Sequence, residues 1–334
     1  MHDAREMDPV VRRPRGLLWF SLLLSLFGTA GLFLLVIASY YGHLWSPLDA
    51  FSHLRVHLIG ATLGLGIAAL SLMTVARVRV AVLVLVIAAV LTVLYAGLWP
   101  ILSQSRQEAP AAGPNEREFK LVSFNSWHEH KNPKQIADYL ATEDADVVVL
   151  VEFPKEFEKV RGLLSQKFPH QYDCNDTAAY CHIAVLSRYP FAEVEAKSNW
   201  KGPPMVRALF GEELGGLTVF GVHFSQPFTP NWQYSQMRAL ASETFVAKGP
   251  FIVAGDFNAT KDSFLVNAFQ EFSGSLRITS LPTWPTWFFE LPQIGIDHMF
   301  ISNGVRPLSP PKVRPNAGSD HLPIKAHLAV RTVQ

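Results

Sequence analysis

Polar side chains that can hold a metal ion or move a proton follow several apolar runs in this sequence. The clearest run is 251–254, which is followed by Gly255, Asp256 and, two residues later, Asn258. Residues two apart in an extended chain point to the same face, so Asp256 and Asn258 are expected to project together from a strand end. A carboxylate beside an amide suits the activation of water and the binding of an oxyanion. A polar β-turn is the alternative interpretation, because Gly, Asp and Asn are common turn formers.

A second carboxylate, Glu152, directly follows the apolar run Val147–Val151. A continuous run of this kind is typical of a strand that is buried on both faces. A buried carboxylate needs a cation or a metal ion beside it, unless the strand simply emerges into solvent at Glu152. Each further candidate has an ordinary structural explanation when taken alone, and only the set indicates a site. These candidates, at predicted strand ends or in the adjoining turns, are Asn125, His223, Asp297, Asp320 and His321.

The elements that would position these residues begin at Phe119. From there the chain alternates short apolar runs with turn and helix signals, which predicts an α/β domain. Strands are predicted at 120–125, 146–152, 182–190, 205–210, 217–224, 251–254 and 295–302, with a last one ending at 330. Helices are predicted at 134–141, 154–167 and 231–245.

The N-terminal third has a different character. Three stretches, 17–40, 56–76 and 80–100, carry no charge, and each is long enough to cross a bilayer. A signal peptide is the alternative for the first stretch, but it is too long for an apolar signal region and further apolar stretches follow. The sequence therefore predicts a cytoplasmic N-terminus at 1–16, a three-helix transmembrane region at 17–100, a linker at 101–118 and a catalytic domain at 119–334.

Arginine placement predicts the orientation of these helices. Arg12, Arg13 and Arg15 precede the first helix, and Arg77 and Arg79 lie between the second and third. Because positive charge favours the cytoplasmic side, three crossings place the residues after the third helix outside the cytoplasm. No acidic and basic pair lies within the spans, which favours an anchor over a transport pathway.

Composition narrows the class of protein. The net charge is +1 over 334 residues, so no basic excess points to nucleic acid. The only cysteines, Cys174 and Cys181, form no zinc-type cluster. A location outside the cytoplasm would permit a disulfide between them, and two buried thiols are the alternative.

Taken in order, the polar strand ends resemble the motifs of the endonuclease/exonuclease/phosphatase superfamily, in its deoxyribonuclease I-like and sphingomyelinase-like branch. The resemblance covers about 119–330 and implies a four-layered α/β sandwich, with two mixed sheets packed face to face and helices outside. The motifs are Ser123-Phe124-Asn125, Leu150-Val151-Glu152, Ala184-Val185-Leu186-Ser187-Arg188, Gly221-Val222-His223-Phe224, Gly255-Asp256-Phe257-Asn258, Ile296-Asp297-His298 and Ser319-Asp320-His321-Leu322-Pro323.

The resemblance also implies roles. Glu152 would be the main metal ligand, with Asn125 and Asp320 near the metal. Oxygen ligands of this kind favour Mg²⁺ or Mn²⁺ over zinc. Asp256 would orient or deprotonate the attacking water, and Asn258 would hydrogen-bond the phosphate.

Two histidines complete the implied chemistry. His321 would contact the phosphoryl oxygens or transfer a proton, with Asp297 holding its imidazole. His223 would be an acid for the leaving group, and it argues against the exonuclease III-like branch, which lacks this histidine.

Two substrate contacts remain more open. Arg207 could meet a phosphate, and a surface strand arginine is an equally good explanation. Trp284 lies in the aromatic segment 282–289, whose rings could stack on bases, contact lipid or pack within the protein.

The sequence thus predicts a membrane-anchored, Mg²⁺-dependent phosphodiesterase, nuclease or phosphatase with its catalytic domain outside the cytoplasm. Its substrate would be a phosphoester of a nucleic acid or of a lipid head group, and no protein partner is inferred. The alternative is a non-catalytic binding or sensing module on the same fold.

Overall fold

The protein is described by a computed structural model. It describes residues 15–74, 77–103, 109–175, 181–198, 200–279, 281–287 and 289–332. The chain divides into two compact units, one formed by residues 1–36 with 56–92 and the other by 37–55 with 93–334. Each unit is considered by itself.

The three predicted N-terminal helices are present. They are α1 (Arg15–Ala38), α2 (Arg55–Thr74) and α3 (Val78–Leu102). All three are long and apolar enough to cross a membrane. At 1.5 Å per residue, the 20 residues of α2 alone span about 30 Å. Most large apolar side chains on these helices are exposed, which is what helices facing lipid require.

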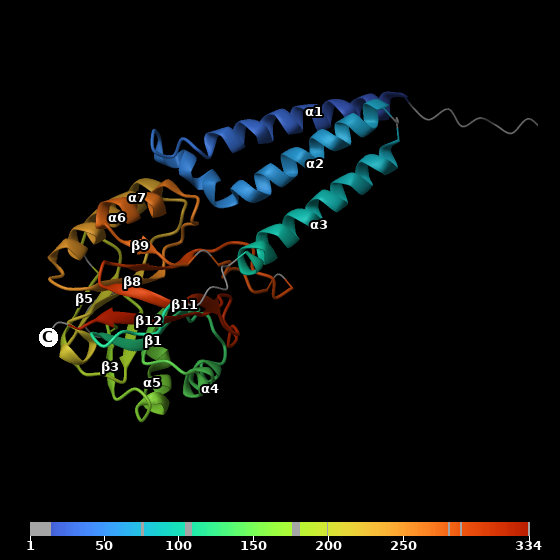
Figure 1. Ribbon diagram of the computed structural model, residues 1–334. Coiled ribbons are helices and arrows are strands. Elements are labelled where there is room, and N and C mark those ends of the chain that lie inside the picture. The colour runs from blue at the N-terminus through green and yellow to red at the C-terminus, as the bar shows by residue number, and fades with distance from the viewer. Residues whose placement is uncertain are drawn as a thin grey trace, which may run out of the picture. The chain divides into compact units, whose positions relative to one another are not determined.

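Two six-stranded mixed sheets form the centre of the second unit (Figure 1). The first sheet has the order β11-β12-β1-β2-β4-β3, and the second has the order β5-β6-β7-β8-β10-β9. Parallel pairs, β1 with β2 and β7 with β8, lie inside each sheet among antiparallel neighbours. The strands are β1 (Glu116–Asn125), β2 (Val147–Val151), β3 (His170–Asp173), β4 (Ile183–Ser187), β5 (Phe191–Lys197), β6 (Met205–Phe210), β7 (Thr218–His223), β8 (Phe251–Asp256), β9 (Leu276–Arg277), β10 (Asp297–Ile301), β11 (Val305–Val313) and β12 (Ile324–Arg331).

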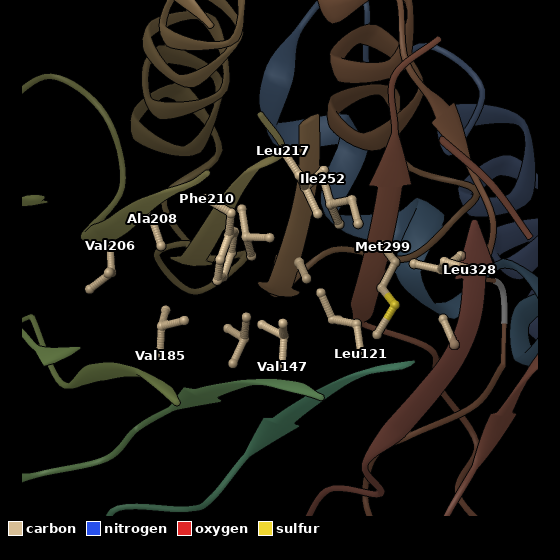
Figure 2. Packing of buried hydrophobic residues seen from close by; sticks show 14 of the residues in the cluster. Leu121, Val147, Val185, Val206, Ala208, Phe210, Leu217, Ile252, Met299 and Leu328 are labelled. Carbon is tan, nitrogen blue, oxygen red and sulfur yellow. The ribbon is translucent and has the colours of Figure 1, made fainter. Parts of the chain in front are cut away.

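The sheets pack against each other through the main core (Figure 2). Strand β2 shows why its sequence is apolar without alternation. Val147, Val149 and Val151 face the core between the sheets, while Val148 and Leu150 face the helical layer. A strand that is covered on both faces has no position left for a polar side chain.

Helices form the two outer layers. The cluster outside the first sheet includes residues of α4 (Lys134–Thr142) and α5 (Glu158–Leu164), and the cluster outside the second includes residues of α6 (Pro230–Val246) and α7 (Phe264–Ser273). The predicted four-layered α/β sandwich preceded by three apolar helices is therefore confirmed.

Several bounds differ from those expected. Strand β1 begins at Glu116, where it pairs with Arg331 of β12, so residues 116–118 of the expected linker belong to the sheet. The helix expected at 154–167 is a 3₁₀ turn at Lys155–Phe157 followed by α5. Cys174 and Cys181 form a disulfide between the end of β3 and the start of β4.

Candidate active site

The end of β8 combines the predicted turn with the predicted site. Asp256 is buried, and its Oδ1 accepts a 2.7 Å hydrogen bond from the backbone N–H of Asn258. Asn258 has a φ of +48°, which a short polar side chain tolerates. Gly255, at a φ of +147°, allows the approach of β7, because a Cβ there would lie 2.0 Å from the carbonyl oxygen of Val222. The turn therefore holds the Asp256 carboxylate in place, so the turn interpretation and the site interpretation are compatible.

Asp297 and His321 form a buried pair beside Asp256. Asp297 begins β10 directly opposite Asp256 in the antiparallel register. Its Oδ2 lies 2.8 Å from Nδ1 of His321. Burial alone would lower the pKa of His321, but the charge and hydrogen bond of Asp297 raise it to about 10. The imidazolium is therefore the stable form, with Nδ1 held by Asp297 and Nε2 as the nitrogen that can act on a substrate.

The pKa of Asp256 lies above the ordinary value of an aspartate. Burial raises its pKa, and the negative charge of Asp297 raises it further, to about 8, although His321 opposes the shift. A carboxylate with a pKa near neutrality can exchange a proton with water during a reaction.

Glu152 follows β2 at a φ of +52° and meets groups from two other segments. Asn125 donates from Nδ2 to Glu152 Oε1 at 3.1 Å and to Asp256 Oδ2 at 3.0 Å. The Oδ1 of Asn125 instead accepts from the backbone N–H of Trp127 at 3.0 Å. An amide nitrogen has no lone pair for a cation, so this orientation does not fit the metal-ligand role expected for Asn125. It fits a residue that positions two carboxylates.

Sequence reasoning missed His128. Its Nδ1 lies 2.5 Å from Glu152 Oε2, and its backbone N–H donates to the same oxygen at 3.2 Å. Burial would raise the pKa of Glu152, but the nearby His223 and hydrogen bonds from His128 and Asn125 lower it to about 2. The sequence does contain an indication of this role, because His128 lies three residues after Asn125, just beyond a strand end.

His223 ends β7 and is partly exposed. Its Nε2 lies 3.7 Å from Glu152 Oε1 and 3.9 Å from Asp256 Oδ2. Burial lowers the pKa of His223, which favours the neutral ring. With this ring neutral, the hydrogen bonds from His128 and Asn125 remain to keep Glu152 ionised.

Two sets of donor atoms are close enough to surround a cation. Glu152, His223 and Asp256 form one, and Asp256, Asp297 and His321 form the other, each with its ligand atoms within 4.8 Å of one another. The second set is already satisfied by the pair between Asp297 and His321. The first set contains Glu152, whose ionised carboxylate is the group in either set best suited to a cation.

Asp320 offers a further oxygen for a cation. Its Oδ2 accepts from the indole Nε1 of Trp284 at 3.1 Å, whereas its buried Oδ1 has no hydrogen-bond partner among the described residues. Burial raises the pKa of Asp320, as expected for a carboxylate that lacks a cation. Trp284 therefore touches the site through its N–H, and the structure gives no evidence that its ring forms a substrate platform.

Arg207 is not brought to the site by any described contact. Its guanidinium donates to Glu195 Oε1 of the neighbouring strand at 2.9 Å. The pairing matches the alternative left open from the sequence, a strand arginine that meets a nearby acid.

Comparison with known proteins identifies the family of this chain. Residues 122–321 match the sequence model of the Endonuclease/Exonuclease/phosphatase family, which is more than half of the chain. The chain belongs to this family. Family members are phosphoester hydrolases, and the polar strand ends described above all fall within or at the edge of the matched residues. No curated protein matches the chain.

Solved structures of family proteins share the fold. SmcL superposes with a TM-score of 0.52 at 19% identity, covering 64% of this chain and 99% of that one. A family protein from Bacteroides vulgatus gives 0.53 at 15% identity, covering 64% and 100%. A doubly substituted beta toxin from Staphylococcus aureus, whose structure has bound magnesium ions, gives 0.51 at 15% identity, covering 63% and 99%.

Proposed function

We propose that this protein is a divalent-metal-dependent phosphoester hydrolase, anchored by α1 to α3 with its catalytic domain outside the cytoplasm. The observation that carries the proposal is the convergence of Glu152, Asp256 and His321 from three separate strand ends. Glu152 is held ionised and His321 is held protonated, as their proposed roles need.

Glu152 and Asp320 would hold Mg²⁺ or Mn²⁺. Glu152 is kept ionised, and the buried Oδ1 of Asp320 lacks a partner among the described residues. These are hard oxygen donors, which suit either cation. The bound cation would neutralise charge on the phosphoryl group and stabilise the leaving oxygen.

The other residues would act on protons and on the phosphate. Asp256 would accept a proton from the attacking water, held in place by Asn125 and by the backbone of Asn258. His321, positively charged through Asp297, would hydrogen-bond the phosphoryl oxygens from Nε2. Nδ2 of Asn258 lies 3.4 Å from Nε2 of His223, and these two side chains would meet the phosphate and the leaving group.

The outward orientation rests on two features. The arginines before α1 in the sequence, together with Arg77 before α3 and Arg79 in its first turn, favour a cytoplasmic location for those helix ends. A disulfide between Cys174 and Cys181 suits an oxidising compartment. Near a bilayer, both a lipid head group and an extracellular nucleic acid could reach the site.

The test is hydrolysis by the purified full chain in detergent. The panel is bis-p-nitrophenyl phosphate, plasmid DNA, sphingomyelin and phosphatidylinositol phosphates, each with Mg²⁺ or with EDTA. We expect turnover that requires metal and falls by about 10²- to 10⁴-fold in His321→Ala. A folded, metal-binding protein without turnover would instead support a binding or sensing module.

A further inference from the structure

The segment 42–55, which connects α1 to α2, contacts the loop that carries Asn258. We propose that this segment is a positioning element of the active site, in which Asp49 and His53 hold residues 258–265 in place. The inference rests on the proposed function and deepens it, because it assigns part of the catalytic geometry to residues that precede the catalytic domain by more than sixty positions.

Asp49 completes the N-terminus of α7. Its Oδ1 accepts from the backbone N–H of Phe264 at 2.7 Å, and its Oδ2 accepts from Leu265 at 3.2 Å. Ser263 caps the same helix by accepting from Val266 at 3.1 Å. The first N–H groups of a helix have no partner within it, and a negative charge there is favoured. The domain thus satisfies one of these three groups with its own Ser263 and obtains the other two partners from the connecting segment.

Asp49 is itself held in place. Its carboxylate is buried, and Ser52 donates to Oδ1 at 3.0 Å from the next turn of the 3₁₀ helix Ser46–Leu54. Gly42 lets the segment fold tightly over it, because a Cβ there would lie 2.8 Å from Cβ of Asp49. The carboxylate therefore has a fixed position from which to hold α7.

His53 and Arg55 make the contacts nearer to the site. The Nδ1 of His53 accepts from the backbone N–H of Thr260 at 3.1 Å, two residues after Asn258. Arg55 lies 3.7 Å from the carboxylate of Asp262 and also donates to the hydroxyl of Ser39 at 2.9 Å. The loop between β8 and α7 is thus held at Thr260 and at Asp262, in addition to the start of α7.

These contacts reach the reacting groups through a short path. Asn258 sits at a φ of +48°, and its N–H orients Asp256. From Asn258 to the first turn of α7, the backbone N–H groups of Thr260, Phe264 and Leu265 are satisfied by the connecting segment. Removing their acceptors leaves these donors unpaired and lets the loop relax, which displaces Asn258 and its contact to Asp256.

The experiment compares three variants of the full chain in detergent. Asp49→Ala and His53→Ala remove the acceptors, whereas His53→Asn retains an acceptor oxygen near the position of Nδ1. His327→Ala is the matched control, since His327 lies on β12 and its described partner is Glu118 of β1. Hydrogen exchange of the peptides covering 258–266 is measured beside kcat and KM for bis-p-nitrophenyl phosphate.

We expect faster exchange confined to 258–266 and a fall in kcat of about 10- to 100-fold in Asp49→Ala and His53→Ala. His53→Asn should recover most of both, and His327→Ala should match the wild type. Faster exchange with unchanged kcat would overturn the positioning role, and unchanged exchange would overturn the contact itself. Absence of turnover in the wild type would count against the proposed function, and the exchange data would still decide whether the segment holds the loop.

Discussion

At the scale of single residues, the site depends on which atom of each side chain faces its neighbour. The residue types could be predicted, because the carboxylates and histidines that follow several apolar runs occur in the order of one family's motifs. Their orientations could not. Asn125 presents its nitrogen to the carboxylates only because the backbone of Trp127 takes its oxygen, and His128 reaches Glu152 through a backbone turn. Neither contact follows from spacing along the chain.

Glu152 is the residue on which metal affinity should depend most. Glu152→Gln removes the charge and replaces one carboxylate oxygen by an NH₂ group, which cannot bind a cation. We therefore expect affinity for Mn²⁺ to fall at least about tenfold. Isothermal titration of the full chain measures this. Glu129→Gln, which changes an exposed carboxylate beside His128, should leave affinity unchanged. Equal losses in both variants would show that general negative charge, and not Glu152, attracts the ion.

A substitution at Trp284 distinguishes two possible roles of this residue, stacking on the substrate and positioning Asp320. Trp284→Phe keeps an aromatic ring but removes the N–H that reaches Asp320 Oδ2. If the indole orients Asp320, kcat should fall by about tenfold, with KM little changed. If the ring stacks on substrate, the phenyl ring should keep most of the activity. Steady-state kinetics on the preferred substrate of the panel distinguishes the two.

At the scale of elements, the sequence predicted secondary structure most accurately where burial is uniform along the element. Strand β2 could be identified because both of its faces are covered. Strand β11 could not, since three prolines interrupt it and it lies at the edge of its sheet, where missing N–H groups are tolerated. Helix α7 was also missed, and part of its N-terminal capping comes from Asp49, which lies 215 residues earlier.

Glu143 links three elements and should control acid stability. At the end of α4, its buried carboxylate accepts from Lys325 of β12 and from Arg314, both at 2.7 Å. Burial would raise its pKa, but these two bonds lower it below the ordinary 4.5. A lowered carboxylate pKa stabilises the fold above pH 4.5, and this contribution is lost as the pH falls through the lowered value.

In Glu143→Gln we therefore expect the free energy of unfolding to drop by about 1–3 kcal/mol at neutral pH. The difference from the wild type should shrink as the pH falls below 4.5. Urea denaturation followed by tryptophan fluorescence, at several pH values, measures both effects. Glu129→Gln, which changes an exposed carboxylate, is the control and should have little effect at any pH. A pH-independent difference would mean that packing, and not charge, is lost.

At the scale of the whole molecule, the contact between segment 42–55 and the catalytic domain constrains topology. The two can meet only on one side of a membrane, so an even number of crossings must separate them. Helices α2 and α3 are each long and apolar enough to supply one crossing, which makes two. The sequence predicted three spans from length and charge, but it could not predict this contact, because nothing in a short polar connection indicates which distant surface it covers.

Reporter fusions test this topology. A reporter that works only outside the cytoplasm should be active when fused at 45 or 110 and silent at 78. The reason is that the arginines at 77 and 79 favour the cytoplasmic side. Activity at 78 with silence at 110 would reverse the orientation. Different results at 45 and 110 would contradict the two-crossing argument as well.

Strand β12 has a consequence for how the protein is made. It is the last of the described strands, yet it lies between β11 and β1, where it pairs with the first strand of the domain along eight consecutive residues. The first sheet therefore cannot close until synthesis has passed β12. A domain that is exported during translation would cross the membrane with this sheet still open, so its folding must follow export. A ribosome stalled just before β12 should leave a chain that proteases digest completely.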